Sequence, residues 1–323
     1  MHEAVRSPAV YAKANGMMLC YDTFGDSMAP PLLLIMGLAA QMTAWDDEFC
    51  GELAGRGYFV VRFDNRDIGL STRLDAAGTP NVAAALMTVA QGKPLAAPYL
   101  LRDMADDAIG LMDALGITAA HVVGASMGGA IGQTLAIHHP SRLRTLTSIM
   151  ATSGAPDLPP PTSEALEVLF HPVPTDREGY LENYVRTWNV LRAGHFPLDE
   201  ARDLIRAQAN FERGLNPAGV ARQMVAILAS GSRQQALAGI NIPTLVIHGD
   251  ADPLVPLACG IHTPECVPGY APRHQRHGPR SANFAMASDY RRHGGARGVV
   301  LSSIGRRHLW ETSVDLKLRL GTT

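Results

Sequence analysis

The sequence feature that most constrains this chain is a glycine-flanked serine at residues 124–128, Gly-Ala-Ser-Met-Gly. The apolar run His-Val-Val leads into it from residue 121, and a segment rich in small residues, 130–136, follows. In a sharp turn from strand to helix, the flanking positions must be glycine because side chains there would collide with the strand and the helix. The pattern therefore predicts a nucleophile elbow that holds the Oγ of Ser126 exposed above a sheet.

Two kinds of phosphate-binding loop also place glycines between a strand and a helix. The dinucleotide fingerprint requires a glycine where Ser126 stands, and the P-loop requires a Gly-Lys-Ser/Thr ending that this segment lacks. A chance match is a third interpretation, since the chain contains 31 glycines. The predicted strand before the serine and the predicted helix after it favour a nucleophile over chance.

Composition narrows the class of protein without identifying a substrate. A chain of 323 residues is long enough for one large α/β domain with an insertion, or for two domains. Its formal net charge of -2 gives no reason to expect nucleic acid or an anionic membrane as partner. No apolar leader or membrane-spanning run is visible, so we expect a cytoplasmic protein. The scattered cysteines fit a reducing compartment: Cys20, Cys50, Cys259 and Cys266.

Strands and helices alternate through the first half of the chain. Continuous apolar runs indicate strands covered on both faces, and a helix between two of them makes a βαβ unit. The predicted strands are 17–25, 31–36, 58–63 and 143–150, and the predicted helices are 45–56, 100–115 and 128–138. The glycine- and proline-rich segment 73–98 is predicted to be an insertion near the site entrance. The polar turn 64–71 contains carboxylates and an arginine, which we assign to turn structure rather than to acid-base chemistry.

A different pattern begins at residue 155, where helices are separated by proline and glycine clusters. The predicted helices are 163–169, 177–191, 199–212 and 217–229. We predict that 155–235 forms a helical cap over the carboxyl ends of the strands, on a core made of 1–154 and 236–323. The cap's aromatic residues either line an apolar pocket or fill the cap's own small core: Phe170, Tyr180, Tyr184, Trp188 and Phe196.

Four motifs in this order resemble the serine α/β-hydrolase superfamily: Gly37-Leu38 after an apolar strand, 64–71, 124–129 and 248–256. Leu-Leu-Leu-Ile-Met-Gly ending at Gly37, followed by Ala-Trp-Asp-Asp-Glu-Phe, is similar to small carboxylesterases of the aclacinomycin methylesterase type. The resemblance covers about residues 12–268. It implies an α/β-hydrolase fold with a mostly parallel eight-stranded sheet, a helical cap, and a triad in chain order Ser, Asp, His.

The resemblance also implies roles for particular residues. Ser126 is the expected nucleophile, and Asp252 in Gly-Asp-Ala-Asp-Pro is the expected acid that orients a histidine, with Asp250 as the less favoured alternative. The backbone N–H groups of Leu38 and Met127 are the expected oxyanion hole. No metal or cofactor is implied, and the expected partner is a small-molecule ester. Oligomeric state stays open.

The chain stops resembling the family after about residue 269, so the triad histidine is ambiguous. His277 lies near the expected separation from Asp252, which favours it narrowly, whereas His308 follows a strand-like run, 298–304. Permitted codons for 273–294, read one base later, can spell a sequence that contains the family's turn, Gly-Met-Gly-His. We therefore favour the hypothesis of a frameshift over that of a natural divergent tail.

The predicted activity is that of a serine esterase, a carboxylic ester hydrolase of EC 3.1.1 type acting on small to medium esters. Ser126 would attack the ester carbonyl to form an acyl-enzyme, which water then hydrolyses. A cofactor-free perhydrolase or haloperoxidase-like member of the same fold is one alternative. A non-catalytic ligand-binding protein is the other, if no histidine reaches Ser126.

Overall fold

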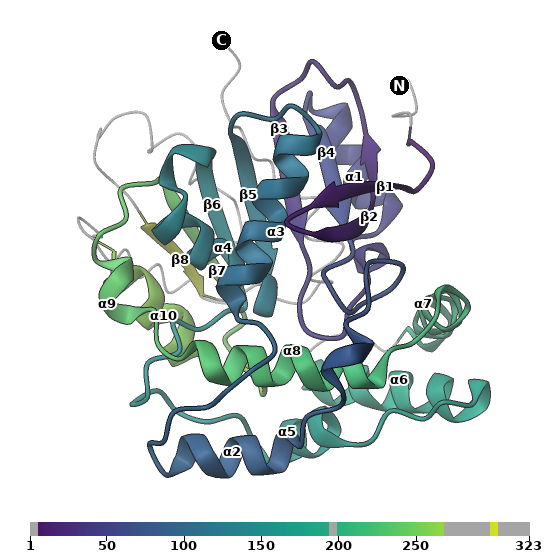
Figure 1. Ribbon diagram of the computed structural model, residues 1–323, viewed down its shortest axis with the longest axis vertical. Helices are drawn as coiled ribbons and strands as arrows, with labels where there is room; N and C mark the ends of the chain where they lie inside the picture. The colour runs from purple at the N-terminus through teal and green to yellow at the C-terminus, as the bar shows by residue number, and fades with distance from the viewer. Residues whose placement is uncertain (1–5, 194–198, 268–297, 303–323) are drawn as a thin grey trace, which may run out of the picture.

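A central, mostly parallel sheet organises the protein (Figure 1), which we analysed as a computed structural model. The structure describes residues 6–193, 199–267 and the backbone of 298–302. The strand order is β1-β2-β4-β3-β5-β6-β7-β8. The strands are β1 Val10–Ala14, β2 Met17–Phe24, β3 Pro31–Ile35, β4 Phe59–Phe63, β5 Ala120–Ala125, β6 Leu143–Ile149, β7 Thr244–His248 and β8 Gly298–Ser302. Among the strands of the described residues, the β1–β2 and β2–β4 pairs are antiparallel and the other pairs are parallel, so the predicted mostly parallel sheet is confirmed.

The apolar run of β3 is continuous because both faces of the sheet are covered. Successive side chains of a strand point to opposite faces. Leu33 and Ile35 accordingly pack into a core cluster shared with α3 Leu101–Ala114 and α4 Met127–His138. Leu32 and Leu34 join a second cluster, which includes residues of α1 Asp47–Gly55. The remaining elements of this part are η1 Met42–Ala44, η2 Asp75–Ala77, α2 Val82–Ala90, η3 Pro140–Arg142, α9 Gln234–Leu237 and α10 Leu257–Glu265.

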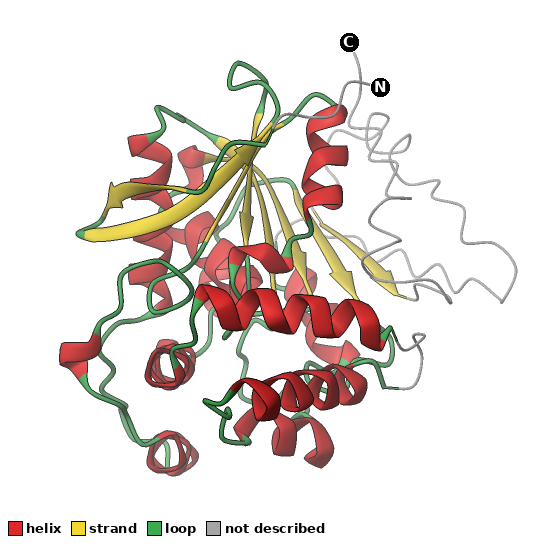
Figure 2. Ribbon diagram, turned by 90° about the vertical axis from the view of Figure 1, so that its right-hand side faces the viewer, coloured by secondary structure: helices red, strands yellow, loops and turns green. Residues whose placement is uncertain are grey.

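A second group of helices lies beyond the ends of the strands (Figure 2). These helices are α5 Ser163–Phe170, α6 Arg177–Leu191, α7 Glu200–Arg213 and α8 Pro217–Ser230. Each begins directly after a residue whose side chain accepts a backbone N–H of the first turn: Thr162, Asp176, Asp199 and Asn216. Such N-caps fix where a helix starts. Helix α8 lies between the sheet and helices α2 and α5 (Figure 1).

Ion pairs join the cap helices to the polar turn 64–71. Arg213 at the end of α7 pairs with Asp64, and Arg222 of α8 pairs with Asp67 at 2.6 Å. Burial favours a higher pKa for Asp67, yet hydrogen bonds from Arg222, a backbone N–H and Tyr99 hold its pKa below the ordinary value. The turn's charges are therefore structural, as predicted, but their partners lie far along the chain rather than only within the turn.

No helix in the described part of the chain is both long enough and apolar enough to cross a membrane.

Candidate active site

Ser126 occupies the sharp turn between β5 and α4 that its glycine neighbours predict. Its backbone has φ 54° and ψ -120°, a left-handed conformation that a residue with a side chain adopts only at a free-energy cost. The Ser126 N–H donates to the carbonyl of Ile149 on the adjacent strand β6, at 2.8 Å. The surrounding structure therefore holds the serine in a strained backbone conformation at the carboxyl end of a central strand.

The glycines around Ser126 are required by close backbone contacts. A Cβ on Gly124 would lie 2.1 Å from the carbonyl oxygen of Gly128. A Cβ on Gly128 would lie 2.1 Å from the carbonyl oxygen of Ile35 on β3. Neither oxygen belongs to a side chain that could move aside, so both positions exclude every other residue type.

The turn after β3 lies directly against Ser126. A Cβ on Gly37 would be 3.1 Å from the Cβ of Ser126 and 3.5 Å from its Oγ. The carbonyl of Met36, which precedes this turn, accepts a hydrogen bond from the Asn65 side chain at 2.9 Å. Within the described residues, the backbone N–H groups of Leu38 and Met127 have no hydrogen-bond acceptor. The two expected oxyanion-hole residues are thus next in the chain to Gly37, which contacts Ser126, and to Ser126 itself.

Asp252 lies in the turn that follows β7. Its Oδ1 accepts the N–H groups of Leu254 at 2.9 Å and Val255 at 2.8 Å. Burial raises the pKa of Asp252, against the opposing effects of those N–H groups and of His248. Its Oδ2 has no hydrogen-bond partner among the residues described, and lies 3.9 Å from Nε2 of His248. Asp250, by contrast, is exposed and its carboxylate bonds to no described residue. This geometry favours Asp252 as the acid.

His248 is close to Asp252 but is fixed in a structural position. Its Nε2 lies 2.6 Å from the Val255 carbonyl, and its side chain is completely buried. A Cβ on Gly260 would lie 2.4 Å from the imidazole ring, so α10 packs tightly against it. His248 therefore stabilises the turn that contains Asp252 and is not available to Ser126.

The two predicted triad histidines, His277 and His308, lie outside the described residues. The strand-like run predicted before His308 does form β8, and it pairs in parallel with β7 from Thr244↔Gly298 to His248↔Ser302. Both strands therefore reach their carboxyl ends side by side, next to the turn that contains Asp252.

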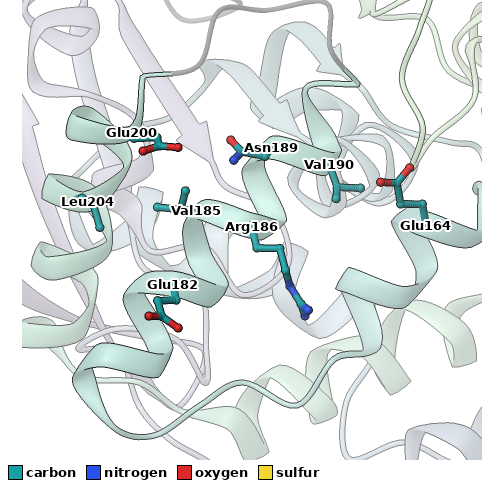
Figure 3. A pocket seen from close by; sticks show the side chains of 8 residues that line it. All are labelled: Glu164, Glu182, Val185, Arg186, Asn189, Val190, Glu200 and Leu204. Atoms are coloured by element: carbon teal, nitrogen blue, oxygen red, sulfur yellow. The ribbon is translucent and has the colours of Figure 1, made fainter.

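An open pocket of about 570 Å³ lies between helices of the cap, and its lining residues do not include Ser126. Figure 3 shows the residues of α5, α6 and α7 that line it: Glu164, Glu182, Val185, Arg186, Asn189, Val190, Glu200 and Leu204. The four described aromatic residues of the predicted set, Phe170, Tyr180, Tyr184 and Trp188, do not line it. Tyr180 instead contacts the rings of Tyr184 and Phe211, and Tyr184 contacts Trp188, so these rings pack within the cap. Phe196 lies outside the described residues.

Two residues at the site were not predicted from the sequence, Asn65 and Gln223. Asn65 belongs to the polar turn that the sequence does single out, but nothing nearby indicates that its amide reaches Met36. Gln223 falls inside a predicted cap helix, directly after Arg222, and no sequence pattern there indicates a role at the site. Its side chain reaches the turn after β3, as described below.

No group of histidine, cysteine, aspartate and glutamate side chains in the described part could hold a metal ion. A parallel sheet with a strained serine at the end of β5 and an acid after β7 defines an α/β hydrolase arrangement. The chain belongs to the α/β hydrolase fold family, whose sequence profile matches residues 30–259. The family resemblance inferred from the motifs is therefore confirmed.

Two sequence relatives and one solved structure are similar to this chain. The chain is 33% identical over 274 residues to rhodomycin D methylesterase DauP from Streptomyces sp. (strain C5), covering 77% of this chain and 84% of that protein. It is 32% identical to rhodomycin D methylesterase DnrP from Streptomyces peucetius, with the same coverage, 77% and 84%. A meta-cleavage product hydrolase from Pseudomonas fluorescens IP01 has a similar fold, with TM-score 0.62, 19% identity, and coverage of 91% and 89%. The two methylesterases support ester hydrolysis as the kind of reaction, and the solved structure supports the fold.

Proposed function

We propose that this chain hydrolyses carboxylic esters through a covalent acyl-enzyme on Ser126. The observation that carries the proposal is the strained backbone of Ser126, with the turn after β3 packed against it. Strain of this kind persists only where the surroundings enforce it, and it is concentrated at functional sites. The methylesterase relatives suggest methyl esters as the substrate class.

The proposed reaction begins when a histidine removes the proton of Ser126 and the Oγ attacks the ester carbonyl. The carbonyl oxygen becomes an oxyanion, which the N–H groups of Leu38 and Met127 would stabilise together with the positive end of α4. The alcohol leaves with the proton from the histidine. Water then attacks the acyl-enzyme by the same steps and releases the acid. Asp252 would hold the imidazole in the tautomer that accepts the serine proton.

The structure gives a reason to place His308 ahead of His277 in this proposal. Strand β8 ends at Ser302, beside the carboxyl end of β7, and His308 follows shortly after it in the chain. Separate His277→Ala and His308→Ala variants test the choice, because only the catalytic imidazole should cost orders of magnitude in kcat. Loss in neither variant would mean that neither His277 nor His308 serves Ser126.

The frameshift hypothesis has its own test, the nucleotide sequence. A shifted frame downstream of codon 270 should encode Gly-Met-Gly-His. If it does not, the tail is natural and the histidine must come from the chain as written.

The test of the proposed function is covalent labelling of Ser126 by a fluorophosphonate, together with hydrolysis of p-nitrophenyl esters of increasing acyl length. We expect labelling at Ser126 and turnover that varies with acyl length. A folded protein that neither labels nor hydrolyses would contradict the proposal and favour a ligand-binding protein. Peracid formation that outpaces hydrolysis of one ester in hydrogen peroxide would favour a perhydrolase.

A further inference from the structure

Gln223 connects the cap to the turn that packs against Ser126. It lies on α8, and its side chain is completely buried. Its Oε1 accepts the N–H of Ala39 at 3.2 Å, and its Nε2 donates to the carbonyl of Arg66 at 2.9 Å. A backbone N–H can only donate and a carbonyl can only accept, so these two partners determine the orientation of the amide.

Ala39 belongs to a turn that needs support from outside. The N–H of Ala40 donates to the Gly37 carbonyl at 3.3 Å, which closes a four-residue turn. Ala39 has φ 61°, the positive value that the third position of a type II turn requires and that glycine adopts most readily. An alanine in this position raises the free energy of the turn. The hydrogen bond from Ala39 to Gln223 compensates for part of that strain.

We propose that Gln223 is a positioning residue for the oxyanion hole. This inference rests on the proposed function, in which the Leu38 N–H is an oxyanion donor. The bond to Ala39 fixes the peptide plane between Leu38 and Ala39. The Leu38 N–H lies in the preceding peptide plane, whose Gly37 carbonyl accepts the Ala40 N–H. Both planes of the turn are therefore held, and the direction of the Leu38 N–H is restricted. On the other side of the turn, Asn65 holds the Met36 carbonyl. The turn is thus held from both ends, by a core residue and by a cap residue.

The neighbouring residue on α8 makes this support rigid. Arg222 is also completely buried and pairs with Asp67, while the carbonyl that Gln223 holds belongs to Arg66. One turn of α8 therefore holds both the polar turn 64–71 and the turn after β3. A preorganised donor stabilises the transition state more than the bound substrate, so its displacement should lower kcat and leave KM nearly unchanged.

The experiment compares Gln223→Met with Gln133→Met. Gln133 is equally buried, and its side chain contacts Ser148 and Arg233 but not the turn after β3. Both changes remove a buried amide, yet only Gln223→Met removes the acceptor of Ala39. We expect kcat on p-nitrophenyl acetate to fall by at least about tenfold in Gln223→Met. The loss should be smaller than the roughly 10²-fold loss that follows when a whole oxyanion-hole donor is removed. KM should stay within about twofold, and Gln133→Met should keep kcat.

A wild-type kcat in Gln223→Met, or equal losses in both variants, would overturn the inference. An inactive wild-type protein would instead contradict the proposed function. Amide hydrogen exchange of the wild type decides the structural part even if Gln223→Met fails to fold. The Ala39 amide should exchange more slowly than the Leu38 amide, and equally fast exchange of the two would also overturn the inference.

Discussion

The two sides of the candidate site are built in different ways. On the nucleophile side, Ser126 depends on Gly124 and Gly128, which are its near neighbours in the chain. On the oxyanion side, the turn at Ala39 depends on Gln223, which is 184 residues away. The first side is marked by glycines next to Ser126 in the sequence, although the carbonyl that crowds Gly128 belongs to Ile35 on β3. The second side depends on a cap residue that no nearby sequence pattern marks. The sequence can therefore single out Ser126 as a candidate nucleophile, but it cannot predict the support of the turn after β3.

The largest expected effect tests the nucleophile side. Ser126→Ala should lower kcat for ester hydrolysis by at least about 10⁴-fold, because the proposed reaction has no other nucleophile. Its thermal unfolding should match the wild type, since alanine keeps the backbone geometry. Ser148→Ala is the control, because Ser148 is a buried serine on the neighbouring strand β6 and should keep activity. If Ser126→Ala keeps most of the wild-type rate, the elbow is not the reaction centre.

The acid after β7 should give the next largest effect. Asp252→Asn should lower kcat by about 10³- to 10⁴-fold, because an amide holds the imidazole in the wrong tautomer. Asp250→Asn, at an exposed carboxylate in the same turn, should change kcat by less than about threefold. Steady-state kinetics of both variants on one ester makes the comparison. Equal losses in the two variants, or a larger loss in Asp250→Asn, would show that Asp252 is not the acid.

The steric basis of the elbow can be tested through stability. Gly128→Ala places a Cβ 2.1 Å from the Ile35 carbonyl oxygen, so we expect a loss of about 4 kcal/mol or more in the free energy of unfolding. Gly51→Ala in α1 is the matched change, because its Cβ meets nothing within 4 Å. Alanine should stabilise that helix by about 0.5–1 kcal/mol. Chemical denaturation of both variants should give opposite signs, and a tolerated Gly128→Ala would refute the crowded elbow.

The parts of the fold that the sequence predicts are those marked by residues next to each element. The cap helices begin where the sequence places them because an N-cap side chain stands before each start. Strand β1 was not predicted, although Asn15-Gly16 is a strong signal for a two-residue hairpin and both residues have positive φ. The contacts of Asn65 and Gln223 have no such signal, because they depend on the packing of segments that are distant in the chain.

The smallest expected effect concerns the cap side and its dependence on pH. The pKa of Asp67 is held below its ordinary value, so its ionised form stabilises the folded state at pH values above about 4, the ordinary pKa of aspartate. That contribution disappears as the pH falls through the lowered pKa. Asp67→Asn should therefore cost about 2 kcal/mol of unfolding free energy at pH 7, since Arg222 loses a charged partner.

The difference between wild type and Asp67→Asn should shrink as the pH is lowered from 7 to about 3, measured by urea denaturation at each pH. Asp113→Asn is the control, because Asp113 pairs with Arg142 at the surface and its side chain is 60% exposed. An exposed pair contributes less than about 1 kcal/mol, so this variant should differ little from the wild type at neutral pH. A constant difference for Asp67→Asn across the pH range would show that the ionised carboxylate is not what joins α8 to the polar turn. The turn after β3 would then be connected to α8 through the amide of Gln223 alone.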